Sequence, residues 1–124
     1  MSSTRKLSLA FAATRGLFGV GLIVLPSRMG TSWLGPDAQR APVHIPIRGL
    51  GARDVALAAG TILAALADAP LRPWLLGSLG SDLTDITSTL AVGDAVPRRA
   101  RLGTVALGGV SAAVSAALAV GTSS

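Results

Sequence analysis

Residues 80–89 read Gly-Ser-Asp-Leu-Thr-Asp-Ile-Thr-Ser-Thr and lie inside a long apolar segment, about residues 74–95. On a helix, Ser78, Asp82, Asp85 and Thr89 are spaced so that all four fall on one stripe. The segment is long enough to span a bilayer, where each carboxylate costs about 2.5–3.5 kcal/mol on insertion scales. We therefore expect this stripe to face another helix or a water-filled cavity.

Three further apolar segments lie at about residues 7–25, 47–67 and 102–120. Half of the residues are hydrophobic and 14% are charged, whereas soluble domains have about 25% charged residues. Mean hydropathy is +0.60. A soluble helical bundle is the alternative, but four segments that reach or approach about 20 residues favour a membrane protein. The sequence predicts an all-α fold, a four-helix transmembrane bundle that forms one integral membrane domain over residues 1–124 in the cell membrane.

The first apolar segment also has to be compared with a signal peptide. Arg15 interrupts its middle, whereas the apolar core of a signal peptide is uninterrupted, and no small-residue cleavage pattern follows. We therefore expect a retained helix. An arginine so central in a span is expected to form an ion pair inside the bundle.

Charge and residue types exclude several functions. The net charge of +5 comes from 11 Lys and Arg against 6 Asp, and the basic residues lie mostly between apolar segments, where they set topology or contact anionic membrane lipid. No nucleic-acid motif is present, so no nucleic-acid partner is expected. The chain has no Cys, which excludes disulfides and thiol catalysis, and its one His, His44, is too few for a histidine metal cluster. We expect neither a metal site nor a cofactor.

Residues 27–46 form the longest connection between apolar segments, and three prolines argue against a continuous helix there. Trp33 and Trp74 stand at segment ends and are expected at the membrane–water boundaries. Four spans place both termini, including a polar tail at residues 121–124, on one side of the membrane. The excess of arginine in the connections on the other side favours a cytoplasmic location for them, with both termini outside.

Five charged residues are expected at membrane depth, and they are the candidate binding residues: Arg15, Arg53, Asp54, Asp82 and Asp85. The segment 74–95 has no basic residue of its own inside the span. Asp82 and Asp85 are therefore expected to meet Arg15, Arg53 or both. Arg53 and Asp54 are about 100° apart on a helix, so we expect each to face a different helix.

Small residues predict where the helices approach closely. In the second segment they follow one side, at Gly49, Ala56, Gly60 and Ala64, and Arg53 lies on that side as well. In the last segment they recur at Gly108, Ala112 and Ala116, and at Ser111 and Ser115. Packing within the bundle is one interpretation of the last set; self-association into a homo-oligomer is the other.

The order of these features resembles a group of small, functionally uncharacterised four-helix bacterial integral membrane proteins. The resemblance rests on the run Arg-Gly-Leu-Gly-Ala-Arg-Asp at residues 48–54, an R-G-x-G-x-R-D motif that opens the second helix. It also rests on Trp74 and on Asp82 with Asp85, and it covers about residues 47–101. The resemblance implies the four-helix membrane fold and no particular activity.

Three functions are compatible with the charged residues. In the favoured one, arginine–carboxylate pairs lock the helices of a structural or interaction subunit, in a homo-oligomer or a larger membrane complex. In the second, the charges line a cavity that binds or transports a small lipophilic molecule or an ion. In the third, Asp82 and Asp85 are the catalytic candidates and act as an acid–base pair on a lipophilic substrate. The spacing Asp-x-x-Asp is typical of diphosphate-binding sites, but a second acidic motif is missing.

Overall fold

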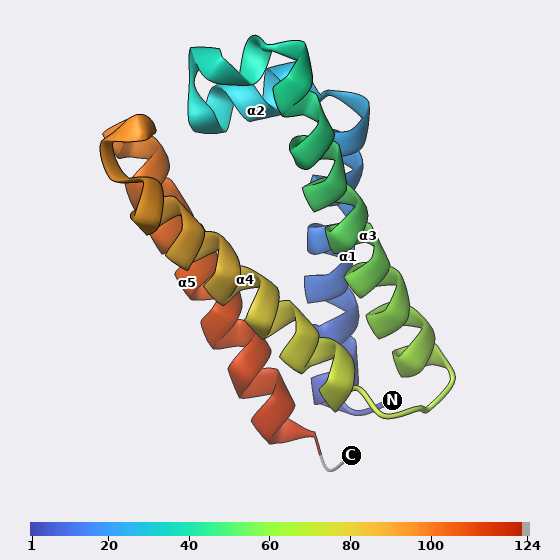
Figure 1. The fold of residues 1–124 in the computed structure, drawn as a ribbon. Helices are drawn as coiled ribbons and strands as arrows, with labels where there is room; N and C mark the ends of the chain where they lie inside the picture. Colours follow the sequence, from blue (N-terminus) through green and yellow to red (C-terminus); the bar gives the residue numbers. More distant parts are fainter. Residues whose placement is uncertain (123–124) are drawn as a thin grey trace.

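The computed structural model describes residues 1–122 and shows an all-helical chain in which these residues form no strand. Of the polar tail expected at residues 121–124, residues 123 and 124 lie outside the described part. Five α-helices and three short 3-10 helices follow one another (Figure 1): α1 (Ser3–Val24), α2 (Pro26–Leu34), η1 (Pro36–Gln39), η2 (Ala41–Val43), α3 (His44–Leu66), α4 (Arg72–Val92), η3 (Gly93–Ala95) and α5 (Arg98–Gly121).

The four expected helices are present, with ends shifted by a few residues, and α2 is an additional one. Prolines explain why the connection at residues 27–46 is helical rather than irregular. Pro26 lies in the first turn of α2, and Pro36 and Pro42 lie at the starts of η1 and η2. A proline is tolerated at a helix start because its missing N–H would have no partner there. The prolines therefore divide this connection into short helices instead of preventing helix formation.

The long helices form two antiparallel pairs. Helix α1 packs along α3, and α4 packs along α5, whereas the two pairs make few contacts with each other (Figure 1). Both described ends of the chain lie at the same end of the bundle. Helix α2, its following 3-10 turns and the α4–α5 turn lie at the opposite end, which we call the α2 end.

Two glycines allow the close approach of α1 and α3. A Cβ atom on Gly51 would lie 2.5 Å from the carbonyl oxygen of Gly19, and a Cβ on Gly19 would lie 2.6 Å from that of Gly51. The predicted contact side of this helix was therefore wrong in part, because a Cβ on Gly49 would have no neighbour from another helix within 4 Å. Gly60 does make a close contact, but with the Trp74 ring of α4. Helix α3 thus has one small face for α1 and another for α4.

Three arginines bind backbone carbonyls at the C-terminal ends of neighbouring helices. The guanidinium of Arg48 donates to Ile23 of α1, that of Arg5 to Ala64 of α3, and that of Arg72 to Ala119 of α5. The last carbonyls of a helix have no partner within it and carry partial negative charge, so a guanidinium stabilises them.

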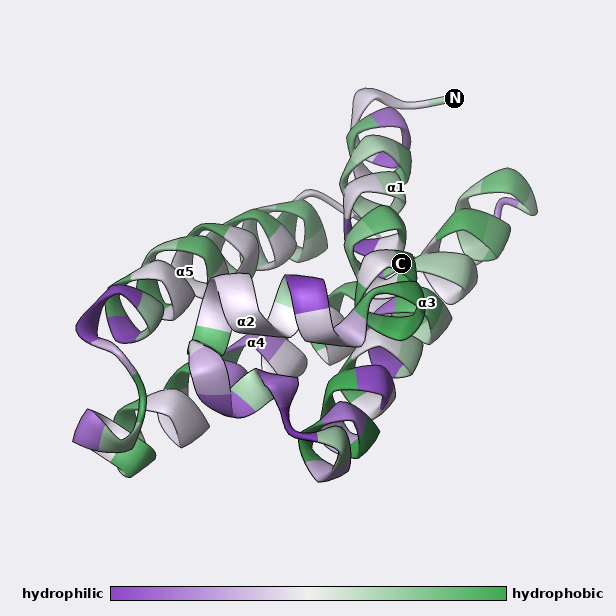
Figure 2. Cartoon of the chain, turned by 90° about the horizontal axis from the view of Figure 1, so that it is seen from above, coloured by the Kyte–Doolittle hydropathy of each residue, from purple (hydrophilic) through white to green (hydrophobic). Residues whose placement is uncertain are grey.

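The surface between the two ends is largely apolar. Large hydrophobic side chains stand exposed along the long helices, among them Leu17, Leu63, Leu107 and Val120. Figure 2 shows hydrophilic residues mainly around α2, at the α4–α5 turn and at the start of α1. Three stretches are long and apolar enough to cross a membrane: Ser3–Val24, Ala41–Leu66 and Arg98–Gly121. Helix α4 is similar in length but is not among the three.

Candidate functional site

A buried cluster of charges joins the two helix pairs. We call Arg15, Arg53, Asp54, Asp82 and Asp85 the charge cluster: α1 contributes Arg15, α3 contributes Arg53 and Asp54, and α4 contributes both remaining aspartates. Ion pairs connect all five side chains to one another. The five candidate residues from the sequence therefore meet in one place.

Arg15 is at the centre of this cluster, with only 7% of its side chain exposed. Its Nη1 donates to Asp54 Oδ1 at 3.0 Å, and its Nη2 donates to both carboxylate oxygens of Asp82 at 2.9 and 2.8 Å. The Phe11 ring lies 5.6 Å from the guanidinium carbon, within the range of a cation–π contact. One arginine thus links α1 to α3 and to α4.

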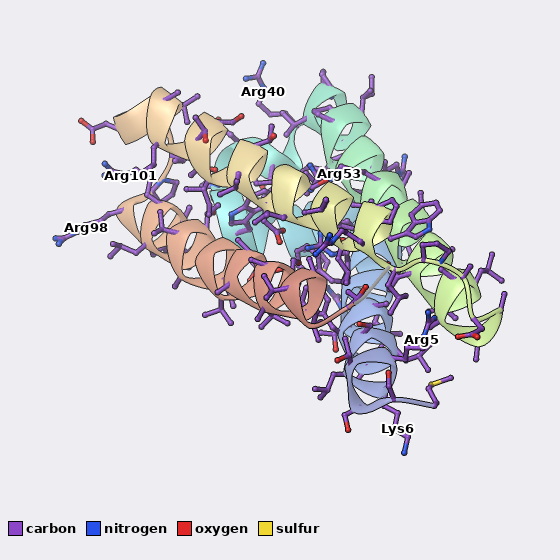
Figure 3. The ribbon with its side chains drawn as sticks, turned by 90° about the horizontal axis from the view of Figure 1, so that it is seen from below. Arg5, Lys6, Arg40, Arg53, Arg98 and Arg101 are labelled. Atoms are coloured by element: carbon purple, nitrogen blue, oxygen red, sulfur yellow. The ribbon has the colours of Figure 1, made fainter. Side chains whose placement is uncertain are left out.

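Arg53 makes the second link between the pairs. Its two terminal nitrogens donate to the two oxygens of Asp85 at 2.9 and 2.7 Å, a two-pronged contact of α3 with α4. This pair is less buried than the Arg15 pairs, with exposed side-chain fractions of 30% and 23%. Figure 3 shows Arg53 within the bundle, whereas Lys6, Arg40 and Arg98 extend outward. A two-pronged arginine–carboxylate contact fixes orientation as well as charge.

The expected contacts of Asp82 and Asp85 with Arg15 and Arg53 are confirmed, with one arginine for each aspartate. Arg53 and Asp54 face different helices as expected, since Arg53 binds Asp85 of α4 and Asp54 binds Arg15 of α1. In addition, Arg53 Nη2 lies 3.4 Å from Asp54 Oδ1. The long arginine side chain can bend back along the helix surface, so a 100° separation at the backbone does not prevent contact at the tip.

Ser111 of α5 belongs to the site, although its sequence context indicated only helix packing. Its hydroxyl accepts a hydrogen bond from Arg15 Nη2 at 2.9 Å and donates to Asp82 Oδ2 at 2.6 Å. The serine therefore brings the fourth long helix into the network. A hydroxyl in an apolar helix usually bonds to its own backbone, so Ser111 carries no sequence signal that separates it from Ser115.

The whole polar stripe of α4 lines the same interface. Ser78, Asp82 and Thr89 are buried and Asp85 is half-buried, as their shared helix face predicted. Two guanidinium groups meet three carboxylates in the cluster, so its formal charge is negative by one. Within residues 1–122, no three histidine or acidic side chains are arranged to hold a metal ion.

The two tryptophans lie near opposite ends of the bundle. Trp33 is in α2, and its indole Nε1 donates to the Thr104 hydroxyl of α5 at 2.7 Å. Trp74 is in the first turn of α4 and is 38% exposed, with its ring packed over Gly60 of α3. Trp33 therefore joins α2 to α5 and Trp74 joins α4 to α3, a packing role additional to the expected boundary location.

Comparisons of the chain with protein-family models, with curated proteins and with solved structures gave no match.

Proposed function

We propose that the chain is a multi-pass protein of the cell membrane in which α1, α3, α4 and α5 all cross the bilayer. Three of these helices are long and apolar enough to do so. Helix α4 has a length of about 30 Å at 1.5 Å per residue, which matches the hydrocarbon core. Its aspartates contact arginines of the other pair instead of the outer surface. Membrane lipid would then cover the exposed leucines and valines of the bundle.

Within this membrane protein, the charge cluster acts as an interhelical lock, and the molecule serves as a structural or interaction subunit. The observation that carries this proposal is that the cluster's arginines bind its own aspartates across three helices. An unpaired charge in hydrocarbon is costly, so such pairing favours one arrangement of the helices. The outer apolar surface remains for a second copy or for a larger membrane complex.

Site-directed labelling tests the four-span topology, because the chain has no native cysteine to give a background. Single variants Ser2→Cys and Thr122→Cys mark the two ends, and Ser32→Cys marks the α2 end. With a membrane-impermeant maleimide and intact cells, we expect both terminal cysteines to react and Ser32→Cys to react only after permeabilisation. Labelling of the two termini from opposite sides would rule out four spans, and labelling of Ser32→Cys alone would reverse the proposed orientation.

The subunit role makes a separate prediction. Protein purified in a mild detergent should elute at a mass larger than one chain plus its micelle, as a homo-oligomer or with a membrane partner. Light scattering coupled to gel filtration measures this mass. A monomer at every concentration, with no co-purified chain, would contradict the subunit role and leave the topology untouched.

A second candidate function is the binding of a small lipophilic molecule, and a groove between α1 and α5 favours it. The groove has a volume of about 450 Å³, and its walls include Leu7, Phe11, Val114 and Leu118. Ala10→Leu should fill it and abolish binding of a fluorescent fatty acid, whereas Ala13→Leu, exposed beside it on α1, should not. An acid–base role for Asp82 and Asp85 has less support, because each aspartate is paired with its own arginine.

A further inference from the structure

The α2 end of the molecule contains a polar hollow that the charge cluster does not involve. Its volume is about 570 Å³, within the range of small-ligand sites. Helix α2 contributes Ser27, Arg28, Thr31 and Ser32, η1 contributes Gln39, and α5 contributes Arg99. Hydroxyl, amide and guanidinium groups therefore line one depression from three separate elements.

The two arginines of the hollow have no acidic partner in the described part of the chain. Residues 1–122 form six ion pairs, and neither Arg28 nor Arg99 takes part in any of them. By contrast, Arg101, two residues beyond Arg99, is paired with Asp94. Two guanidinium groups that face one depression without a carboxylate create a positive potential, which favours an anion between them.

The backbone and a buried hydroxyl add to this preference. Arg28 and Arg99 lie in the first turns of α2 and α5, and no side chain caps either helix start. The N–H groups of a first turn lack partners within the helix and carry partial positive charge. The Thr31 hydroxyl is buried and has no hydrogen-bond partner among residues 1–122, and such a group normally has one.

Contacts between α2 and α5 hold the walls of the hollow in place. Trp33 and Thr104 are hydrogen-bonded across the two helices, and Gly35, which ends α2 with φ = 88°, packs near Pro97 at the start of α5. The C-terminal part of α2 is thus attached to the start of α5, which reduces the ordering cost when a ligand binds between the two helices.

We propose that this hollow binds a phosphate group, held by Arg28 and Arg99 with the hydroxyls of α2. Arginine is suited to phosphate because its planar fork donates two parallel hydrogen bonds to phosphate oxygens. Two sources share this chemistry: the headgroup of an anionic phospholipid and a free phosphate. The lipid source rests on the proposed membrane location, in which the α2 end lies at headgroup level; the free source does not.

Titration of the full-length protein in detergent separates these sources. The probes are short-chain phosphatidylglycerol, short-chain phosphatidylcholine and inorganic phosphate, and Trp33 fluorescence with isothermal calorimetry provides the readout. If a lipid headgroup is the ligand, phosphatidylglycerol should bind at least about tenfold more tightly than either other probe. If free phosphate is the ligand, inorganic phosphate should bind and phosphatidylglycerol should not.

Matched variants connect the binding to the hollow. The double variant Arg28→Gln and Arg99→Gln should lower the affinity for the probe by at least about tenfold, because it removes two charge-assisted contacts. Arg40→Gln is the control, since Arg40 is exposed at the same end and does not line the hollow. Circular dichroism checks that the helices persist. Absence of binding by both phosphatidylglycerol and inorganic phosphate, or equal weakening by Arg40→Gln, would overturn the proposal, even if the labelling experiment established four spans.

Discussion

Arg15 pairs with two of the three carboxylates in the charge cluster. Replacement by methionine would leave Asp54 without its closest cation, and the Asp82 carboxylate would keep only its hydrogen bond from the Ser111 hydroxyl within the described residues. Loss of one partner of a buried ion pair costs about 3–5 kcal/mol. We therefore expect Arg15→Met to lower the free energy of unfolding by an amount in that range, measured by titration with sodium dodecyl sulfate from mild detergent. Lys6→Met is the control on the same helix; Lys6 is exposed, so its loss should change stability by less than about 0.5 kcal/mol.

A double-mutant cycle then tests whether Arg15 and Asp82 act as a pair. Asp82→Asn keeps the shape of the side chain and removes its charge. The loss for both changes together should be smaller than the sum of the single losses, by about 0.5–3 kcal/mol, because residues in one ion-pair network are coupled. Strict additivity would show that the contact at 2.8 Å contributes nothing to stability.

At the scale of helices, Gly49 and Gly51 differ in whether they lie on the face of α3 that contacts α1. A methyl group at Gly51 would collide with the backbone of Gly19, whereas one at Gly49 has open space. We expect Gly51→Ala to destabilise the α1–α3 pair by about 1–3 kcal/mol through overpacking. Gly49→Ala should instead be neutral or stabilising by up to about 1 kcal/mol, since alanine is the better helix former. Thermal unfolding in the same detergent compares the two variants, and equal effects would contradict the close approach of α1 and α3.

The helices themselves were largely predictable, because length and hydropathy decide where a membrane segment can lie. The face of α3 that contacts α1 could not be predicted, because small residues occur on both sides of that helix and periodicity alone cannot select Gly51 over Gly49. Helix α2 was not predicted. The prolines of residues 27–46 correctly indicated that no continuous helix fills this connection, but Pro26 before them is a helix starter in this position. The pairing of the charges could be anticipated from the lack of a cation in residues 74–95. The role of Ser111 could not, because it depends on where α5 packs.

For the whole molecule, the arrangement predicts two halves whose association depends on polar contacts. Besides the charge cluster and the Trp74 contact, the α1–α3 and α4–α5 pairs share an apolar cluster in which Ala64 and Ala65 of α3 pack with Leu75 of α4 and Leu118 of α5. Apolar side chains supply little drive for association inside a bilayer, because lipid is as apolar as they are. The ion pairs are therefore expected to decide whether the halves stay together.

Cutting the chain in the exposed turn between α3 and α4 tests this expectation. Asp68 in that turn is almost fully exposed and has a positive φ of 53°, so a break there should disturb neither helix pair. Fragments of residues 1–69 and 70–124, co-expressed with an affinity tag on one of them, should co-purify from membranes. Arg15→Met together with Arg53→Met should reduce the recovered partner by about tenfold or more, since loss of a buried pair costs several kcal/mol and 1.4 kcal/mol is a factor of ten. Lys6→Met in the same fragment removes a cation outside the cluster and should leave recovery unchanged. If the double variant recovered as much partner as Lys6→Met, apolar packing would be sufficient to join the halves and the charge cluster would not be their lock.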